Sequence, residues 1–334
     1  MATCFEETCC EFTGEDKSKC NAICPHKPDF ADWLSDTGGL RCDDIPSIAQ
    51  QPLDLPFYVP MIDHEYSRRQ TFEWPVVALD TYKTIRVRIN NGSRYCAVAS
   101  TPEGLRKKFR IGNKAKVILR GVAKDPPLER WWENRLESGA PGQIASLGIH
   151  AAVAPNFSHF LGVPRTDNLF NRQRQLTCLA ELADAGLCVM PHLSAIMPAD
   201  WQFWLRFLEA TPGVKYVAKE FQTGNKSVSE GRKAIDRMSQ LQDSLKRDLH
   251  PVVIGAAQYV EEFAGRFKRF TLIDSNPFSK AWRRQQFELS AGKQPWYPRL
   301  LLKGMYIDDL LRHNVEGYSA WINKRVRVAR AGRG

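Results

Sequence analysis

Residues 72–85, FEWPVVALDTYKTI, decide the fold because four consecutive apolar residues, 76–79, stand directly before Asp80. A short valine-rich run of this kind favours a buried strand. Comparable runs recur along the chain, and we expect eight strands, at 74–80, 95–100, 115–125, 146–156, 187–193, 214–221, 251–258 and 269–275. Asp80 would then be the first of a series of polar groups at strand ends.

Helical patterns separate the later runs. Residues 168–186 repeat apolar residues at helical spacing and stop at Gly186, a residue suited to a left-handed cap. Another helix is expected from Pro198, and a third from Ser227, where Ser227-x-x-Glu230 matches a capping box. Strands alternating with helices predict a parallel sheet covered by helices, here a (β/α)8 TIM-like barrel. A doubly wound open sheet is the alternative, although no glycine-rich phosphate loop follows any run.

The chain is long enough to bury a large core and to form more than one domain. It has 334 residues, of which 43% are hydrophobic. We expect a small Cys-rich metal-binding N-terminal lobe over 1–70, the barrel over 71–290, and a C-terminal helical extension with a basic tail over 291–334. Runs of about 18 apolar residues are absent, and the start is acidic where a secretory signal would be basic and then apolar. The sequence therefore predicts a cytoplasmic protein with no membrane partner.

Basic residues are concentrated after residue 45. The whole chain carries a formal charge of +10, but its first 45 residues hold ten acidic and four basic residues, so the remainder carries +16. A basic body favours a polyanion, in the first place DNA; a solubilising excess of charge is the alternative. The candidate contacts to the DNA backbone come from the basic segments 104–116 and 324–334 and are Arg106, Lys107, Lys108, Arg110, Lys324 and Arg325.

Five of the nine cysteines fall within the first 24 residues: Cys4, Cys9, Cys10, Cys20 and Cys24. In a reducing compartment such clustering favours a metal over disulfides. The spacing matches neither a paired CxxC ribbon nor a CxxxCxxC cluster motif. Structural zinc is the first expectation, an iron–sulfur cluster the second and free thiols the third. No organic cofactor is expected.

Polar or ionisable residues follow nearly every run, where a barrel of this type places its site. The candidate catalytic residues are Asp80, Asp125, Glu220 and Asp274, and the candidate base-binding residues are Tyr82, Asn156, Phe157, His192, Gln222 and Gln258. Asp125 also fits the cap of a helix that opens with two prolines, and Glu220 also fits a salt bridge. Paired carboxylates without metal-binding histidine pairs are typical of glycosidic bond cleavage.

Asp80 after VAL, the helical body, the cysteine lobe and the basic surface resemble the tRNA-guanine transglycosylase superfamily, including its DNA-directed 7-deazaguanine branch. The resemblance covers roughly residues 72–290. Two features differ: the family's Asp-Ser-Gly-Gly is here Asp80-Thr81-Tyr82-Lys83, and its CxCxxC zinc site is absent. Segments 121–132 and 155–175 also look like proteins of phage and mobile-element neighbourhoods. The resemblance implies cleavage of a base–sugar bond, with removal of the base favoured over its exchange.

The sequence thus predicts a DNA glycosylase acting on a modified base, in the setting of phage defence. A base-exchange transglycosylase and a non-catalytic nucleic-acid-binding barrel are the alternatives. A flipped base would stack on Tyr82, Trp131, Phe157 or Phe221, while Asn156, Gln222 and His192 read its edge. Asp80 or Glu220 would stabilise the developing cation, and Asp274 would support it.

Overall fold

Two four-stranded parallel sheets form the centre of the computed structural model, which describes residues 22–64, 66–89, 93–222, 227–289, 296–300 and 306–332. The first sheet has the order β2 (Val76–Asp80), β5 (Lys116–Arg120), β6 (Ala151–Val153) and β7 (Val189–Met190). The second has the order β1 (Tyr58–Pro60), β10 (Thr271–Asp274), β9 (His250–Ile254) and β8 (Tyr216–Glu220). The α/β class with parallel strands is therefore confirmed.

Two isolated parallel bridges connect the edges of these sheets. One pairs Met61 with Ala78, after β1 and within β2, and the other pairs His192 with Ala218, after β7 and within β8. Main-chain hydrogen bonds support both: Ile62 N donates to Ala78 O at 2.9 Å, and Leu193 N donates to Ala218 O at 2.7 Å. Each sheet edge thus has a neighbour in the other sheet.

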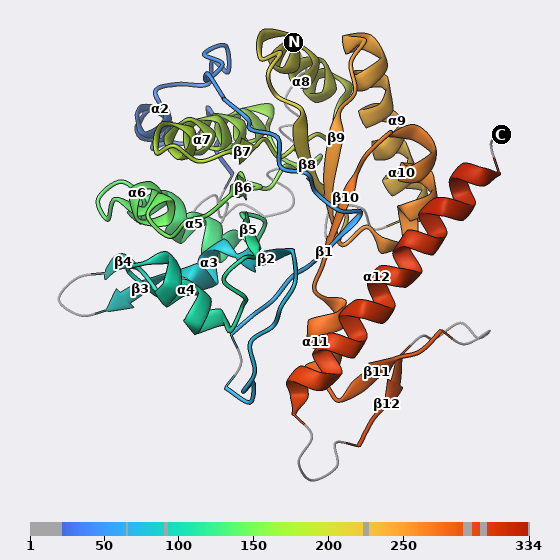
Figure 1. Cartoon of the computed structure of the whole chain (residues 1–334). Helices are drawn as coiled ribbons and strands as arrows, with labels where there is room; N and C mark the ends of the chain where they lie inside the picture. The colour runs from blue at the N-terminus through green and yellow to red at the C-terminus, as the bar shows by residue number, and fades with distance from the viewer. Residues whose placement is uncertain are drawn as a thin grey trace.

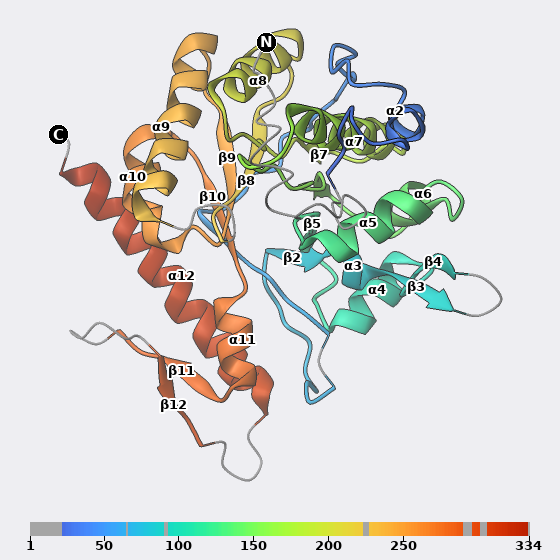
Figure 2. The ribbon, with the colours of Figure 1, turned by 180° about the vertical axis from the view of Figure 1, so that it is seen from behind.

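Helices lie on the outer side of the strands in both views (Figures 1 and 2). In chain order the helices are α2 (Phe30–Thr37), α3 (Thr81–Thr84), α4 (Pro102–Phe109), α5 (Asp125–Asn134), α6 (Ala140–Ala145), α7 (Arg165–Asp184), α8 (Pro198–Ala210), α9 (Val228–Leu245), η2 (Ala257–Tyr259), α10 (Val260–Arg266), α11 (Asn276–Trp282) and α12 (Ile307–Ala331). None of the described helices is both long and apolar enough to cross a membrane.

The expected helix signals are confirmed. Gly186 follows α7 with a φ of 86°, and Pro198 is the first residue of α8. The Ser227 side chain accepts a hydrogen bond from Glu230 N at 3.2 Å, so it caps α9. Local capping chemistry therefore fixed these helix ends, as it does in isolated helices.

Each central strand is buried on both faces, with alternate residues in two different cores. Val76, Ala78 and Ala218 belong to an inner cluster between the strands, whereas Val77 and Val217 belong to the larger cluster under the helices. Burial of both faces is typical of parallel strands covered by helices. Side chains at strand ends therefore inherit either the inner or the outer direction.

The prediction that residues 95–100 form one of the parallel strands was wrong. β4 (Ser93–Ala97) pairs antiparallel with β3 (Ile85–Ile89), and this hairpin projects away from α12 (Figure 1). The eighth parallel strand is instead β1, within the segment expected to be the cysteine lobe. A three-residue strand is too short to show periodicity, and a short apolar run does not reveal its partner. A second hairpin, β11 (Gln285–Phe287) with β12 (Trp296–Pro298), precedes α12.

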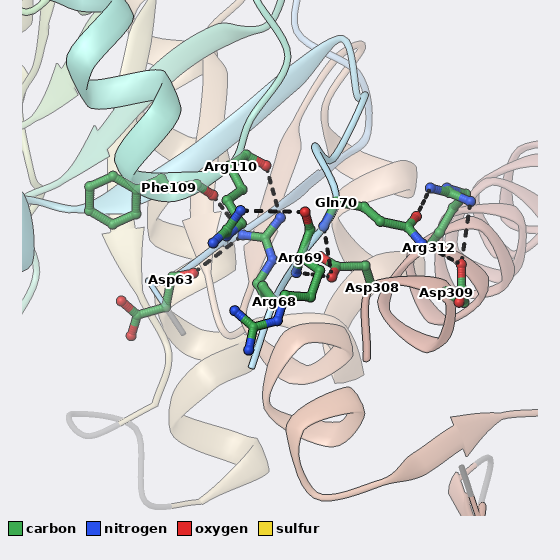
Figure 3. A network of polar contacts seen from close by, with 9 residues as sticks. All are labelled: Asp63, Arg68, Arg69, Gln70, Phe109, Arg110, Asp308, Asp309 and Arg312. Atoms are coloured by element: carbon green, nitrogen blue, oxygen red, sulfur yellow. Dashed lines mark hydrogen bonds and ion pairs between the residues drawn. The ribbon is translucent and has the colours of Figure 1, made fainter. Parts of the chain in front are cut away.

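A buried ion pair attaches the start of α12 to the segment between β1 and β2 (Figure 3). Arg68 is 1% exposed, and its Nε donates to Asp308 Oδ1 at 3.0 Å. Its two terminal nitrogens donate to the carbonyls of Phe109 at 2.6 Å and Arg110 at 2.8 Å, at the end of α4. Asp308 also accepts from the main-chain N–H groups of the two residues after Arg68. Three distant segments are thereby held together.

Candidate functional site

A cleft of about 450 Å³ opens at the carboxyl ends of β5, β6, β7 and β8. This is the edge at which parallel α/β proteins bind ligands. The polar side chains that line the cleft come from four successive strand–helix connections and are Asp125, Asn156, Ser158, His159, His192, Ser194, Lys219 and Glu220. With Phe157, which also lines it, the cleft thus brings together two predicted catalytic carboxylates and three predicted base-binding residues.

Glu220 ends β8 and is 8% exposed. Tyr216 and Ala218 of the same strand lie in the inner cluster, so the alternation of the strand directs Glu220 to the inner side, at the mouth of the cleft. Its Oε2 accepts a hydrogen bond from Gln222 N at 2.7 Å. This bond fixes the carboxylate at the strand end.

His192 is buried, and its hydrogen bonds identify its tautomer. Its Nε2 lies 3.1 Å from the main-chain N–H of Glu220 and must accept that proton. Its Nδ1 therefore carries the proton and donates to Ser194 Oγ at 2.9 Å. Burial, followed by the charge of Lys219, lowers the pKa of His192 well below its usual range. His192 thus joins β7 to β8 as a neutral ring whose nitrogens are both occupied.

His159 offers the free imidazole nitrogen of the cleft. Its Nδ1 lies 3.0 Å from Phe157 O and donates to that carbonyl, which leaves Nε2 as an acceptor. The Nε2 atom is buried and has no hydrogen-bond partner among the residues that the structure describes. Burial, reinforced by Arg172, lowers the pKa of His159 to about 4. His159 follows the run expected at 146–156 but was not among the candidate residues, because only the fold shows which of its ring nitrogens has no partner.

The pKa of His159 predicts a pH effect on stability. An unfolded histidine titrates near 6.5, whereas the folded one stays neutral down to about pH 4. The unfolded chain therefore binds more protons in this window, so this contribution is complete above about pH 6.5 and is lost as the pH falls toward 4. We expect the free energy of unfolding of the wild type to fall by about 2 kcal/mol more than that of His159→Gln between pH 7 and 4.5. Urea titrations measure this difference, and parallel pH curves for the two proteins would contradict it.

Asp125 lies on the other side of the cleft. It is the first residue of α5, and its Oδ1 accepts a hydrogen bond from Ser158 Oγ at 2.5 Å. The expectation that Asp125 caps the helix was wrong, because Lys124 holds the N-cap position of α5 and no side chain caps it. Asn156 is more constrained, because its amide oxygen accepts from Ala123 N at 2.8 Å and holds the β5 loop against the β6 loop. Its amide nitrogen is the end that a ligand in the cleft can reach.

Several predicted stacking residues are part of the core. Phe157 is 1% exposed, packs edge-on against Trp132 at 6.1 Å, and has Arg174 4.3 Å above its ring. Trp131 is also 1% exposed. Tyr82 is only partly buried; its hydroxyl donates to Gly121 O at 2.9 Å, and its ring meets Trp131 edge-on. Phe157 nevertheless lines the cleft, and Tyr82 lines a neighbouring hollow, whereas Trp131 lines neither.

Asp80 borders a second hollow of about 350 Å³, which shares Ala123 with the cleft. Its Oδ1 accepts from Tyr82 N at 2.9 Å, and its Oδ2 pairs with Arg120 at 2.5 Å. Three further basic side chains line this hollow: Lys83, Arg86 and Arg130. Asp80 is thus a helix cap and an ion-pair partner, and not a free nucleophile for a sugar. The basic side chains around it suit the binding of an anion.

Asp274 ends β10 on the outer side of the strand, where it faces α12, and it lines neither hollow. Its Oδ2 accepts from Tyr318 Oη of α12 at 2.7 Å, and its Oδ1 accepts from Asn276 N at 2.8 Å. Burial raises its pKa. Gln222 is exposed and lies two residues after Glu220. Gln258 is also exposed and lies in η2.

The predicted DNA-backbone residues divide into two groups. Arg106 donates to the carbonyls of Gly112 and Ala115, and Arg110 donates to Arg69 O at 3.4 Å. Arg325 pairs with Glu261 and lies over the ring of Trp321. Only Lys107, Lys108 and Lys324 of this set are exposed. Structural contacts thus occupy the arginines, whereas these lysines face solvent.

Most of the predicted metal ligands, Cys4, Cys9, Cys10 and Cys20, lie outside the described residues. Cys24 is described, and it forms no disulfide with another described cysteine. Within the described ranges, no three His, Cys, Asp or Glu side chains are grouped so that they could hold a metal ion. The zinc and iron–sulfur expectations therefore stay predictions.

Comparisons with known proteins give distant likenesses among solved structures. No protein-family model and no curated protein matches the chain. Among solved structures, an assigned sugar phosphate isomerase/epimerase from Anabaena variabilis matches with 11% identity and a TM-score of 0.33. The match covers 67% of this chain and 78% of that one. At this distance it assigns neither substrate nor reaction.

Proposed function

We propose that this chain cleaves the N-glycosidic bond of a base in DNA, in the cleft at the carboxyl ends of its strands. The observation that carries the proposal is that Glu220 and the unpartnered Nε2 of His159 border one cleft, beside a hollow with three basic side chains. A carboxylate and a neutral base suit the reacting sugar, and the cations suit its phosphates. The function expected from the sequence is thereby retained: Glu220 keeps its expected role, whereas His159 and Asp125 act beside it in place of Asp80 and Asp274.

We also propose that the eight parallel strands act as one closed barrel. The order β2-β5-β6-β7-β8-β9-β10-β1 follows the chain, with β1 returning beside β2, and the two isolated bridges lie at the two junctions between the sheets. A doubly wound sheet would reverse its strand order instead. Closure would place Asp80, Arg120 and Glu220 around one mouth.

In the proposed reaction, phosphates next to the target nucleotide bind Lys83, Arg86 and Arg130, and the nucleotide enters the cleft. Glu220 stabilises positive charge at C1′ as the bond to the base lengthens. Water adds to C1′ and gives a proton to His159 Nε2, the departing base takes up a proton from solvent, and His159 then releases its own proton to solvent. The products are a free base and an abasic site. Asp125, held by Ser158, orients the water.

The test is mass spectrometry of bases released from a panel of unmodified and modified phage DNAs by the purified full-length chain. We expect release of one class of base together with abasic sites in the DNA. Parallel incubation with labelled free base separates hydrolysis from exchange, because exchange incorporates label and leaves no abasic site. Failure to release any base from any DNA of the panel would overturn the proposed function.

A further inference from the structure

Lys219 is a buried lysine in the cleft that the proposed hydrolysis does not use. It precedes Glu220 in β8, is 7% exposed and lines the cleft. Its Nζ donates to Leu193 O at 3.0 Å and lies 5.3 Å from the centre of the Trp201 ring. Among the residues that the structure describes, no carboxylate forms an ion pair with it. An ammonium in such a place is costly, because one carbonyl and one ring replace its water.

Burial lowers the pKa of Lys219 to about 8, against the opposing effects of Glu220 and Asp200. These two carboxylates, on β8 and α8, and the neutral rings of His192 and His159 are the titratable groups around it. About a tenth of Lys219 is then a neutral amine at pH 7, far more than for an exposed lysine, which titrates near 10.4. A neutral amine at a cleft wall is a nucleophile for carbonyl carbon.

We propose that Lys219 forms an imine with an aldehyde bound in the cleft, and that this aldehyde is the ring-opened sugar of an abasic site. The second half rests on the proposed function, since base removal produces such a sugar. The Nζ lone pair adds to C1′, the carbonyl oxygen gains protons and leaves as water, and a C=N bond remains. Loss of a C2′ proton to His159 Nε2 then lets the 3′ phosphate leave with its bonding electrons, which breaks the strand.

The test uses an oligonucleotide that already carries one abasic site, mixed with the full chain and sodium cyanoborohydride. Hydride adds to the imine carbon and converts the imine to a stable secondary amine. We expect a covalent protein–DNA adduct that peptide mass spectrometry maps to Lys219, with a trapping rate that rises with pH and reaches half its maximum near pH 8. Strand breaks at the abasic site should appear when the reductant is omitted.

Two variants remove the amine in different ways: Lys219→Arg keeps a cation, and Lys219→Met keeps the stem. Both should lose the adduct, whereas Lys215→Arg, at an exposed lysine just before β8, should keep it. Circular dichroism of each variant checks folding. Adduct on other lysines only, or an adduct that survives both Lys219 variants, would overturn the proposal.

The two proposals fail separately in this design. Because the abasic site is supplied ready-made, a chain that releases no base still reports on imine formation. A chain that releases bases but shows no adduct at Lys219 would be a hydrolase alone, with Lys219 serving to hold the Leu193 carbonyl.

Discussion

Replacing Glu220 with glutamine is expected to lower the rate of base release by about 10²–10⁴-fold, the usual range for a group that assists charge or proton movement in a transition state. Glutamine has the same shape, and its amide oxygen can still accept the hydrogen bond from Gln222 N. The bond to His192 uses the main-chain N–H of residue 220, so the substitution leaves it intact. The lost property is the negative charge beside C1′.

Single-turnover assays on the DNA that the panel identifies would measure this change, with DNA binding followed separately. Glu209→Gln is the matched control, because Glu209 is an exposed carboxylate in α8 and makes the same change of charge. A Glu220→Gln rate close to that of the control would show that Glu220 does not act in the reaction.

Asp80→Asn should weaken DNA binding or folding more than the chemical step, because Asp80 pairs with Arg120 and caps α3.

Replacing Arg68 with leucine is expected to lower the free energy of unfolding by about 3–5 kcal/mol. The substitution removes the partner of a buried carboxylate and leaves the carbonyls of Phe109 and Arg110 without their donor. Both effects are costly in a site where Arg68 is 1% and Asp308 is 3% exposed. The start of α12 would lose its attachment to α4 and to the segment before β2.

Chemical denaturation monitored by circular dichroism measures this loss. Lys268→Met is the control: it breaks an ion pair with Asp248 whose side chains are 78% and 55% exposed, and it should cost at most about 1 kcal/mol. The double variant Arg68→Leu with Asp308→Leu should recover part of the loss, because it removes the uncompensated buried charge. An Arg68→Leu loss as small as that of the control would show that the pair contributes little to stability.

Local signals were sufficient for much of the helical framework. Gly186, Pro198 and Ser227 end or begin helices by interactions within a few residues, and these are readable from the chain. The strand at 95–100 failed because a short apolar run does not say whether its partner is parallel or antiparallel. β1 was missed because three residues show no period.

The sequence predicted that the site lies at the carboxyl ends of the strands, but it did not predict which side chains form it. Strand ends with polar residues gave Asp125, Glu220 and His192, and these do line the cleft. Arg106 and Arg325 read as free cations in the sequence, yet carbonyls and Glu261 occupy them in the fold. Hydrogen-bond and ion-pair partners that lie far away in the sequence leave no local pattern. Composition alone therefore overstates how many cationic side chains are free to bind DNA.

The sequence by itself determined the alternation of strands and helices, the helix caps and the polar character of the strand ends. Only the tertiary structure decided which way each end residue points. Asp80 and Glu220 share their strand face with the inner-cluster residues Ala78 and Ala218, whereas Asp274 shares its face with Leu272 and meets Tyr318 of α12. Because both faces of a covered parallel strand are apolar, its period of two carries no mark of inside or outside. That direction is set by the neighbouring strands and helices, and it separates Glu220 on the inner side from Asp274, which meets α12 on the outer side.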